Sequence, residues 1–129
     1  MASIFTKIID GQLPGNFVWK DDACVVILTI QPLRPGHMLV IPRAEIDHWD
    51  DLPDELAAHL MLVSKKMAKA LKKAYPSARV GMAIAGLEVP HVHLHVFPIN
   101  TLNDFDFSQA ESAGAEALAK VAENLRAAL

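Results

Sequence analysis

The chain has 129 residues, 52% of them hydrophobic, and a formal net charge of −3. This length is enough for one domain with its own core and too short for two, so we expect residues 1–129 to form a single domain. The slightly acidic balance argues against a nucleic-acid partner. The single cysteine, Cys24, excludes a disulfide framework. Apolar runs far below the ~18 residues of a membrane span, and the lack of a signal peptide, predict a cytoplasmic protein with no membrane partner.

The first third of the chain predicts a short helix and a β-hairpin. Residues 3–9 carry apolar side chains at helical spacing, with Ser3 as the N-cap and Gly11 just past the end. The strands expected next cover residues 17–20, 23–30 and 36–43. Asp21-Asp22 joins the first two strands in a hairpin, and a turn with two prolines separates the second from the third.

The clearest helix covers residues 53–75, where apolar side chains recur every three or four positions. Pro53 opens this helix and Pro76 ends it. Five lysines in its second half are interpreted as a solvated face, because no aromatic residues interleave with them as in a nucleic-acid patch. Two more strands and an Ala-rich helix are expected at residues 79–85, 92–97 and 109–129. We expect Phe105 and Phe107 to hold the loop before this last helix against the body of the domain.

Three histidines alternate with apolar residues between positions 91 and 96. Alternation predicts a half-buried strand in which His91, His93 and His95 share one face and the residues between them point into the core. Burial does not explain three histidines in this pattern. Histidine is a common metal ligand, but the Cα atoms of His91 and His95 would lie about 13 Å apart, which strains convergence on one ion. The alternative is phosphorus chemistry, in which one imidazole attacks a phosphoryl centre and a second protonates the leaving group.

The segment from His91 to Phe97 resembles the His-x-His-x-His motif of the histidine triad (HIT) family of nucleotidyl hydrolases and transferases. Residues 36–43 resemble the family's Gly-His-x-Leu-Val-x-Pro segment. The resemblance implies an α+β fold, with a five-stranded antiparallel sheet packed against one long helix and with shorter N- and C-terminal helices. Residues 3–98 would form the core of this HIT domain, and residues 99–129 its C-terminal loop and helix. The resemblance also implies a homodimer that acts on a small-molecule nucleotide.

The same resemblance implies roles for four histidines. His93 would attack the α-phosphorus and form a nucleotidyl-histidine intermediate, and His95 would assist proton delivery to the leaving group. His91 and His37 would form a hydrogen-bonded pair that orients the nucleophile. The implied reaction releases a nucleoside monophosphate from a nucleoside phosphoramidate or a dinucleoside polyphosphate, with no cofactor and no metal.

Three further segments would bind the nucleotide together with His93 and His95. By resemblance, they supply Ile4, Phe5, Ile8, Leu28, Thr29, Ile30, Gly86, Leu87, Glu88 and Val89. Thr29 stands where relatives present Asp or Asn to the ribose, and its hydroxyl cannot accept from two ribose donors as a carboxylate does. Leu87 and Glu88 stand where relatives present Gln and Ser or Thr to the phosphates. Glu88 places a negative charge beside the expected phosphate.

Zinc-containing relatives carry a Cys-x-x-Cys pair where this chain has Ser3 and Thr6, and a histidine near the position of Glu45. The sequence therefore predicts no structural zinc. Two alternatives to the metal-free enzyme stay open. One is a nucleotide-binding relative with little turnover, which the substitutions at residues 29, 87 and 88 favour. The other is a metal-dependent enzyme built on the histidine strand.

Overall fold

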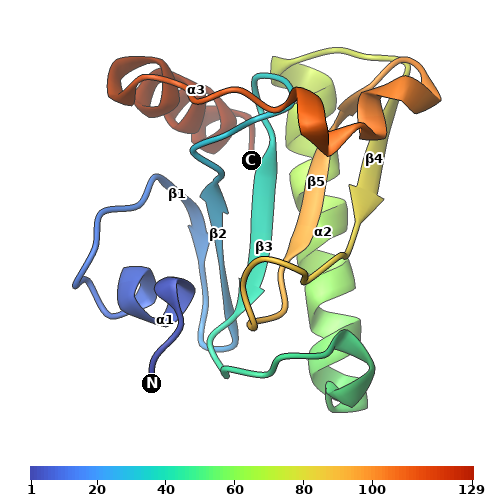
Figure 1. Ribbon diagram of the computed structural model, residues 1–129. Helices are drawn as coiled ribbons and strands as arrows, with labels where there is room; N and C mark the ends of the chain where they lie inside the picture. The colour runs from blue at the N-terminus through green and yellow to red at the C-terminus, as the bar shows by residue number, and fades with distance from the viewer.

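A five-stranded antiparallel sheet forms the centre of the computed structural model, which describes all residues from Met1 to Leu129 (Figure 1). Its strands are β1 (Phe17–Lys20), β2 (Cys24–Leu28), β3 (Met38–Pro42), β4 (Arg79–Ala83) and β5 (Leu94–Ile99). They lie in the order β1-β2-β3-β5-β4, and every neighbouring pair is antiparallel. β3 and β5 are therefore adjacent, with Leu39 opposite His95. This pairing brings the two histidine-containing segments of the chain side by side.

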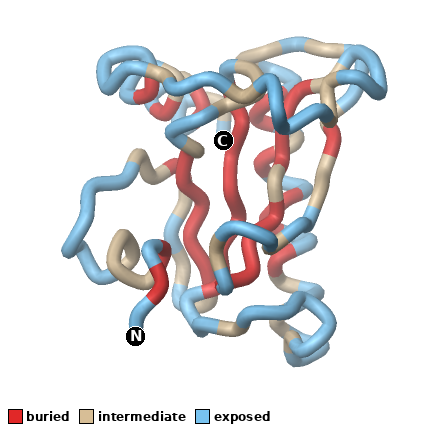
Figure 2. The backbone as a smooth tube through the Cα atoms, viewed as in Figure 1, coloured by how far each residue is buried: buried red, intermediate tan, exposed pale blue.

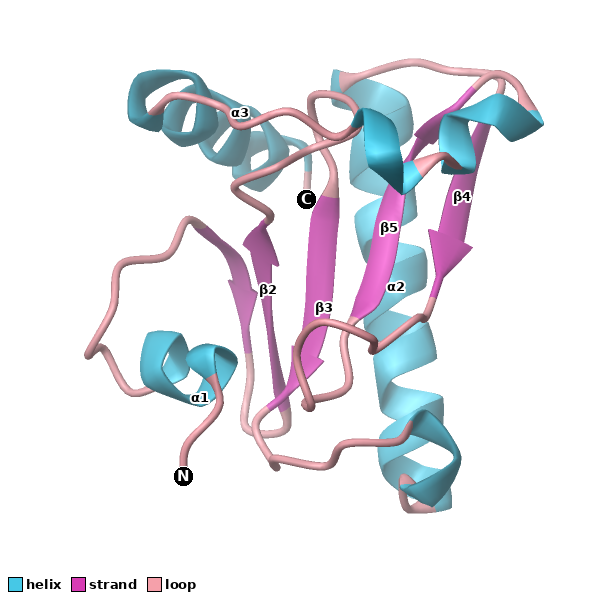
Figure 3. Cartoon of the chain, viewed as in Figure 1, coloured by secondary structure: helices cyan, strands magenta, loops and turns pink.

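Helices cover the two faces of the sheet unequally. α2 (Asp54–Ala74) and α3 (Ala115–Ala128) lie on one face (Figures 1 and 3), where a cluster of 17 buried residues forms the main core. α1 (Ile4–Ile9) lies on the opposite face. There Phe5 packs with the buried side chains of Val25, Ile27, Leu39 and Ile41. No long helix covers the rest of that face, which leaves the surface beside β3 and β5 free for a site.

The α+β fold and the five-stranded sheet predicted from the sequence are confirmed. β2 and β3 are buried over their whole length (Figure 2), because each contributes alternate side chains to the clusters on both faces. α2 places Leu60, Val63, Met67 and Leu71 in the core at spacings of three and four residues. Ser3 caps α1 as predicted, because its side chain accepts a hydrogen bond from the Thr6 N–H (3.1 Å). No helix has both the length and the apolar character that a membrane span requires.

The predicted start of the histidine strand is wrong. β5 begins at Leu94 rather than at residue 92, so the first two histidines of the triad precede the strand. The β3–β5 ladder stops here because Val92 N–H donates to the Ile46 carbonyl (2.7 Å) instead of to β3. Pro42, the last residue of β3, has no N–H to extend the ladder. The backbone before Leu94 therefore lies outside the ladder, although Val92 still packs in the main core and His91 and His93 both contact Phe5 on the other face.

The predicted start of the C-terminal helix is also wrong. α3 begins at Ala115 rather than at Gln109. The residues before it are held extended, since Ala113 N–H donates to the Ile30 carbonyl (3.0 Å) in the connection between β2 and β3. The C-terminal segment thus packs against the turn that precedes β3 before it becomes helical.

Asp21 ties the β1–β2 hairpin to α2. Its carboxylate accepts hydrogen bonds from the Trp19 indole (2.8 Å), the His59 ring of α2 (2.7 Å) and the Cys24 thiol (3.6 Å). Burial raises the pKa of Asp21, but the bonds from Trp19 and His59 and two from backbone amides outweigh it and hold the pKa well below its ordinary value. Burial and the nearby Asp21 charge raise the pKa of Cys24 to about 12, so the thiol stays protonated.

Candidate active site

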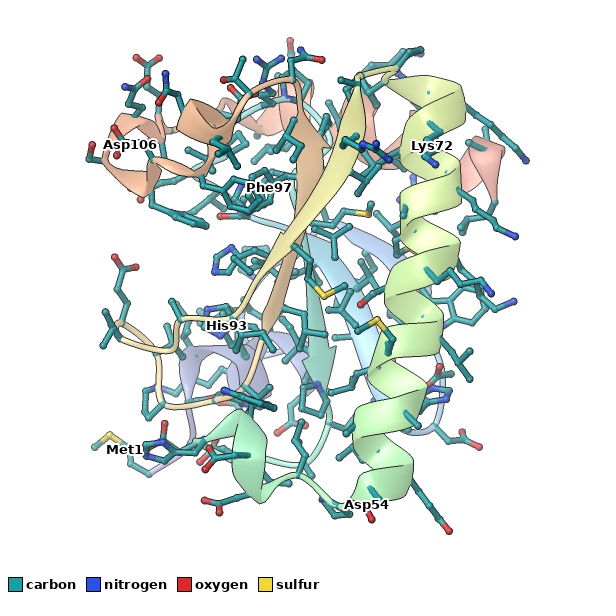
Figure 4. All side chains as sticks on the ribbon, turned by 90° about the vertical axis from the view of Figure 1, so that its right-hand side faces the viewer. Met1, Asp54, Lys72, His93, Phe97 and Asp106 are labelled. Carbon is teal, nitrogen blue, oxygen red and sulfur yellow. The ribbon has the colours of Figure 1, made fainter.

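The triad histidines lie on the face of the sheet opposite α2. Figure 4 shows His93 and Phe97 on that side of the sheet, with Asp106 farther along in the segment after β5. Phe5 of α1 contacts the His93 ring edge-on, with 4.8 Å between ring centroids. The rings of His93 and His95 are neighbours at 5.0 Å. Two adjacent histidine rings, framed by α1 and by the segment after β5, form the candidate active site.

Hydrogen bonds assign the tautomers of His37 and His95. The Leu33 N–H donates to His37 Nδ1 (3.1 Å), so a neutral His37 carries its hydrogen on Nε2. That Nε2–H donates to His95 Nδ1 at 2.9 Å. A neutral His95 must then carry its own hydrogen on Nε2. The chain of donors that starts at the Leu33 amide therefore leaves His95 Nε2–H as the group available to a ligand.

His93 has the opposite arrangement. Its Nδ1 lies 2.7 Å from the His91 carbonyl oxygen, and a carbonyl only accepts, so Nδ1 carries the hydrogen. Nε2 of a neutral His93 then has a free lone pair. Neighbouring rings thus differ in the group that each offers, which is a lone pair on His93 and an N–H on His95.

The predicted hydrogen-bonded pair of His91 and His37 is wrong. The His91 ring is fully buried (0% exposed), its Nε2–H donates to the Pro42 carbonyl (2.8 Å), and its Nδ1 accepts from the Ser3 hydroxyl (2.6 Å). The ring of His37 instead bonds His95, and the His91 ring lies against Phe5 of α1, with 5.8 Å between ring centroids. His91 contributes its carbonyl, rather than its ring, to the candidate site.

Burial keeps the histidines of the site in the neutral form at pH 7. Burial and, to a smaller extent, a neighbouring histidine lower the pKa of His37 to about 3 and that of His95 to about 4. Burial also lowers the pKa of His93, although the hydrogen bond to the His91 carbonyl and the charge of Glu88 oppose that shift. A neutral imidazole is the nucleophilic form, so His93 is ready to react without prior deprotonation.

The apolar residues predicted to line a nucleotide base do not all face the site. Phe5 touches His93, Ile8 packs against the same cluster as Phe5, and Ile4 is 49% exposed. The prediction for Leu28 is wrong, because its side chain lies in the main core on the side of α2. Alternate residues of a strand point to opposite faces, so Ile27 is the β2 residue that packs beside Phe5.

Thr29 and Ile30 follow the end of β2. The Thr29 hydroxyl accepts a hydrogen bond from the Gln31 N–H (3.2 Å), and Ile30 is 67% exposed. Thr29 N–H donates to the His37 carbonyl (3.3 Å). The position predicted for ribose recognition is therefore adjacent to the His37–His95 pair.

The loop from Gly86 to Val89 has an exposed middle and an anchored end. Gly86 has a φ of +76°, a conformation that favours glycine. Leu87 is 94% exposed, and Glu88 is exposed as well. Val89 packs against the cluster around α1. The Glu88 charge nonetheless raises the pKa of His93, so this loop acts electrostatically on that ring.

Phe107 is a site residue that the sequence did not predict. Its ring contacts His95 edge-on at 4.8 Å and His37 at 6.1 Å between centroids, so it covers the histidine pair. Phe105 packs on Phe97 at 5.1 Å and holds the loop, as expected. An aromatic residue shortly after the triad was the available signal, but its distance from His95 depends on how the chain folds back after β5.

The donor sets of the chain do not favour a metal centre at the histidines. Only Asp21, Cys24 and His59, in the hairpin region, place three possible ligand atoms within 4.8 Å of one another. Where zinc-containing relatives carry two cysteines, this chain has Ser3 and Thr6. Their hydroxyls are neutral, whereas zinc prefers thiolate and imidazole ligands. This arrangement weakens the metal-dependent alternative.

The antiparallel sheet with clustered histidines beside two central strands defines a histidine-triad type of domain. The HIT domain family matches residues 10–102, and the chain belongs to this family of nucleotide-binding hydrolases and transferases.

Relatives and solved structures agree with this assignment. An uncharacterized HIT-like protein of Methanocaldococcus jannaschii is 35% identical over 99 residues, covering 74% of this chain and 77% of that protein. The adenosine 5′-monophosphoramidase HNT1 of Saccharomyces cerevisiae is 37% identical over 98 residues, covering 75% of this chain and 62% of that protein. The crystal structure of a HIT-like protein from Bartonella henselae, described as involved in cell-cycle regulation, aligns with a TM-score of 0.87 at 29% identity. That alignment covers 98% of this chain and 96% of the other.

Proposed function

We propose that this protein is a nucleotidyl hydrolase or transferase that cleaves nucleotide conjugates at the α-phosphorus through a nucleotidyl-His93 intermediate. The supporting observation is the pair of complementary tautomers, with a lone pair on His93 Nε2 and a hydrogen on His95 Nε2. The lone pair is needed for attack on phosphorus, and the hydrogen is needed to stabilise the charge on the leaving group. The monophosphoramidase activity in the name of the yeast relative makes nucleoside phosphoramidates the first substrate class to test.

In the first step the lone pair of His93 Nε2 forms a bond to the α-phosphorus. The bond from phosphorus to the leaving atom breaks, and both of its electrons move to that atom. An amine leaving group then needs a proton. The negative charge of the bound phosphate raises the pKa of His95 from about 4, so the His37–His95 pair takes up one proton from solvent. This proton enters at His37 Nδ1, where it displaces the hydrogen bond from the Leu33 N–H, and the hydrogen on His37 Nε2 shifts to His95 Nδ1 as His95 Nε2–H passes to the leaving nitrogen.

In the second step a water molecule attacks the same phosphorus. His95 accepts a proton from this water, the bond between phosphorus and His93 Nε2 breaks, and its electrons return to the ring. A nucleoside monophosphate leaves, and the histidines regain the protonation that they had before the first step. An acceptor other than water turns the same cycle into a transfer reaction.

The nucleotide is proposed to lie along the site face of the sheet. Ile4, Phe5 and Ile8 of α1 supply an apolar surface for the base. The Thr29 hydroxyl retains one hydrogen to donate to the ribose, after accepting from Gln31. Backbone amides of residues 86–89 are available to the phosphate oxygens.

A second candidate function is nucleotide binding with little turnover. The loop beside His93 carries an exposed leucine and an exposed glutamate, Leu87 and Glu88. Neither side chain donates a hydrogen bond to a phosphate, and the glutamate repels it. These substitutions in the phosphate-binding loop favour weaker catalysis at the same site.

Turnover of adenosine 5′-phosphoramidate separates the two candidates. His93→Ala is expected to lower turnover by at least about 10³-fold while calorimetric binding of AMP survives, because a covalent nucleophile is lost. His48→Ala is the matched control, since the His48 side chain is 73% exposed. Mass spectrometry of the quenched wild-type reaction is expected to find the nucleotidyl group on His93. If His93→Ala turns over the substrate as fast as the wild type, the mechanism is contradicted. If the wild type binds AMP but shows no turnover, the second candidate function is selected.

We also propose a homodimer. β4 lies at one edge of the sheet with no partner on its outer side, and Met61 and Leu62 of α2 are each more than half exposed. An unpaired strand edge and exposed apolar side chains are the features that a second subunit would cover. Light scattering coupled to size-exclusion chromatography tests this, and a mass of one chain at micromolar concentration contradicts it.

A further inference from the structure

A polar cluster at the start of α1 lies next to the site. Ser3 is the N-cap of α1 and is 8% exposed. Its N–H donates to Glu45 Oε1 (2.6 Å), its Oγ accepts from the Thr6 N–H (3.1 Å), and its hydroxyl lies 2.6 Å from His91 Nδ1. The Thr6 hydroxyl donates to the same Glu45 oxygen (2.7 Å). We call Ser3, Thr6 and Glu45 the α1 anchor.

The direction of each hydrogen bond in this cluster is determined. The Pro42 carbonyl accepts from His91 Nε2–H at 2.8 Å, so Nδ1 of a neutral His91 has a lone pair. The Ser3 hydroxyl is the donor that satisfies it. The other oxygen near this hydroxyl, Thr6 Oγ1, is 3.4 Å away, which is long for a hydrogen bond between hydroxyls. The Ser3 hydroxyl therefore donates its single hydrogen to His91 Nδ1.

We propose that Ser3 is a positioning residue for the nucleophile and acts through His91; this inference rests on the proposed function of His93. Ser3 and Pro42 hold the His91 ring at its two nitrogens, on opposite sides of the ring. A ring held at two points fixes the His91 backbone, and the His91 carbonyl is the acceptor that keeps the hydrogen of His93 on Nδ1. Without the Ser3 hydroxyl, a buried ring nitrogen loses its partner.

Glu45 and Thr6 keep Ser3 in this position. Glu45 is exposed, but one of its oxygens bonds both the Ser3 N–H and the Thr6 hydroxyl, which joins the loop after β3 to the first turn of α1. These two bonds and the nearby His91 contribute to holding the pKa of Glu45 below its ordinary value, so the carboxylate is ionised at neutral pH. The nucleophile is thus linked to α1 by a continuous series of hydrogen bonds.

Two substitutions at Ser3 separate positioning from helix capping. Glycine is a fair N-cap without a hydroxyl, whereas threonine keeps both the cap and the hydroxyl. Lys7→Gly is the matched control, because it weakens α1 without touching the α1 anchor. We expect kcat for adenosine 5′-phosphoramidate to fall about ten- to a hundredfold in Ser3→Gly, with little change in KM, since a displaced nucleophile slows the chemical step. Ser3→Thr and Lys7→Gly are expected to stay within about threefold of the wild-type kcat.

Nitrogen NMR of the imidazole rings reports the tautomers without any turnover. The wild type and Ser3→Thr are expected to show His91 with its hydrogen on Nε2 and His93 with its hydrogen on Nδ1. Ser3→Gly is expected to show a mixture of tautomers at His93. Wild-type kcat in Ser3→Gly, or an unchanged His93 tautomer, overturns the positioning role. If the wild type itself shows no turnover but the tautomers change as expected, the proposed function fails while the positioning of His93 stands.

Discussion

His93 and His95 are two residues apart in the chain, yet different parts of the molecule hold them. His93 is held by the His91 carbonyl, and the His91 ring is held in turn by α1 and by the end of β3. His95 is held by the His37 ring, which accepts from the Leu33 amide in the connection between β2 and β3. The first support thus depends on the N-cap of α1 and on the last residue of β3. The second lies beside the C-terminal segment that carries Phe107.

The two supports differ in what they allow. A carbonyl only accepts, so the His91 carbonyl permits one tautomer of a neutral His93. A bond between two rings allows the hydrogen to shift, so the His37–His95 pair can take up a proton when an anion binds nearby. A nucleophilic imidazole needs a lone pair that stays on the same nitrogen. A proton donor needs a ring that can gain and lose a proton. The His91 carbonyl thus holds His93 in one tautomer, whereas the His37 ring lets His95 exchange a proton.

The largest effects are expected for substitutions of His93 and His95, and the dependence on the leaving group distinguishes the two residues. His95→Asn is expected to slow cleavage of a phosphoramidate, whose amine needs a proton, by about 10²- to 10⁴-fold. The same variant should slow a nitrophenyl ester of AMP much less, because nitrophenolate departs without a proton. His93→Ala should abolish both reactions. Steady-state rates with the two substrates check this, and equal losses in His95→Asn would contradict its role in proton delivery.

The stability of the protein should fall on mild acidification. In the unfolded chain His37 and His95 have pKa values near 6.5, whereas the folded protein lowers them to about 3 and about 4. Below pH 6.5 the unfolded state binds protons that the folded state excludes, so the free energy of unfolding decreases by up to ~1.4 kcal/mol per pH unit for each histidine. Urea denaturation from pH 7 to pH 4 measures this decrease. His37→Asn should remove a large part of it, and a flat profile in the wild type would rule out neutral buried histidines.

Phe107 is expected to affect mainly the His37–His95 side. Phe107→Ala admits water to the pair and should raise the pKa of His95 toward its ordinary value, because burial is the main cause of its depression. The pKa of His93 should change less than that of His95, because the Phe107 ring contacts His95 and His37. Leu102→Ala, an 85% exposed residue of the same segment, is the matched control. NMR titration of the ring resonances measures both histidines, and an unshifted His95 argues against shielding by Phe107.

The smallest effect is expected at Glu88. Glu88→Gln removes a charge that raises the pKa of His93, so the acid limb of activity should move to lower pH. It should also tighten AMP binding about two- to fivefold at low salt, since a like charge near the phosphate is lost. Glu116→Gln in α3 is the charge-matched control. Calorimetry at two salt concentrations checks the binding, and equal affinities would place Glu88 away from the phosphate.

Local patterns predicted much of this molecule because they depend on near neighbours in the chain. Apolar spacing identified α2, and the Ser3 cap identified α1. The alternation around His95 correctly sent Val92, Leu94 and Val96 into the core. Leu28 shows the limit of such patterns: the strand was predicted, but the face that meets the site depends on where α1 packs.

The sequence by itself determined the α+β class, the family and three histidines that line the site, because periodicity and motif spacing are properties of contiguous residues. Only the tertiary structure decided which nitrogen of each ring carries its hydrogen. A tautomer is set by the group that each ring nitrogen meets, and those groups come from distant parts of the chain. Leu33 meets His37, whereas Ser3 and Pro42 meet His91. Folding therefore gives similar histidines different groups to offer: a free lone pair on His93, a free N–H on His95, and a buried ring with both nitrogens hydrogen-bonded at His91.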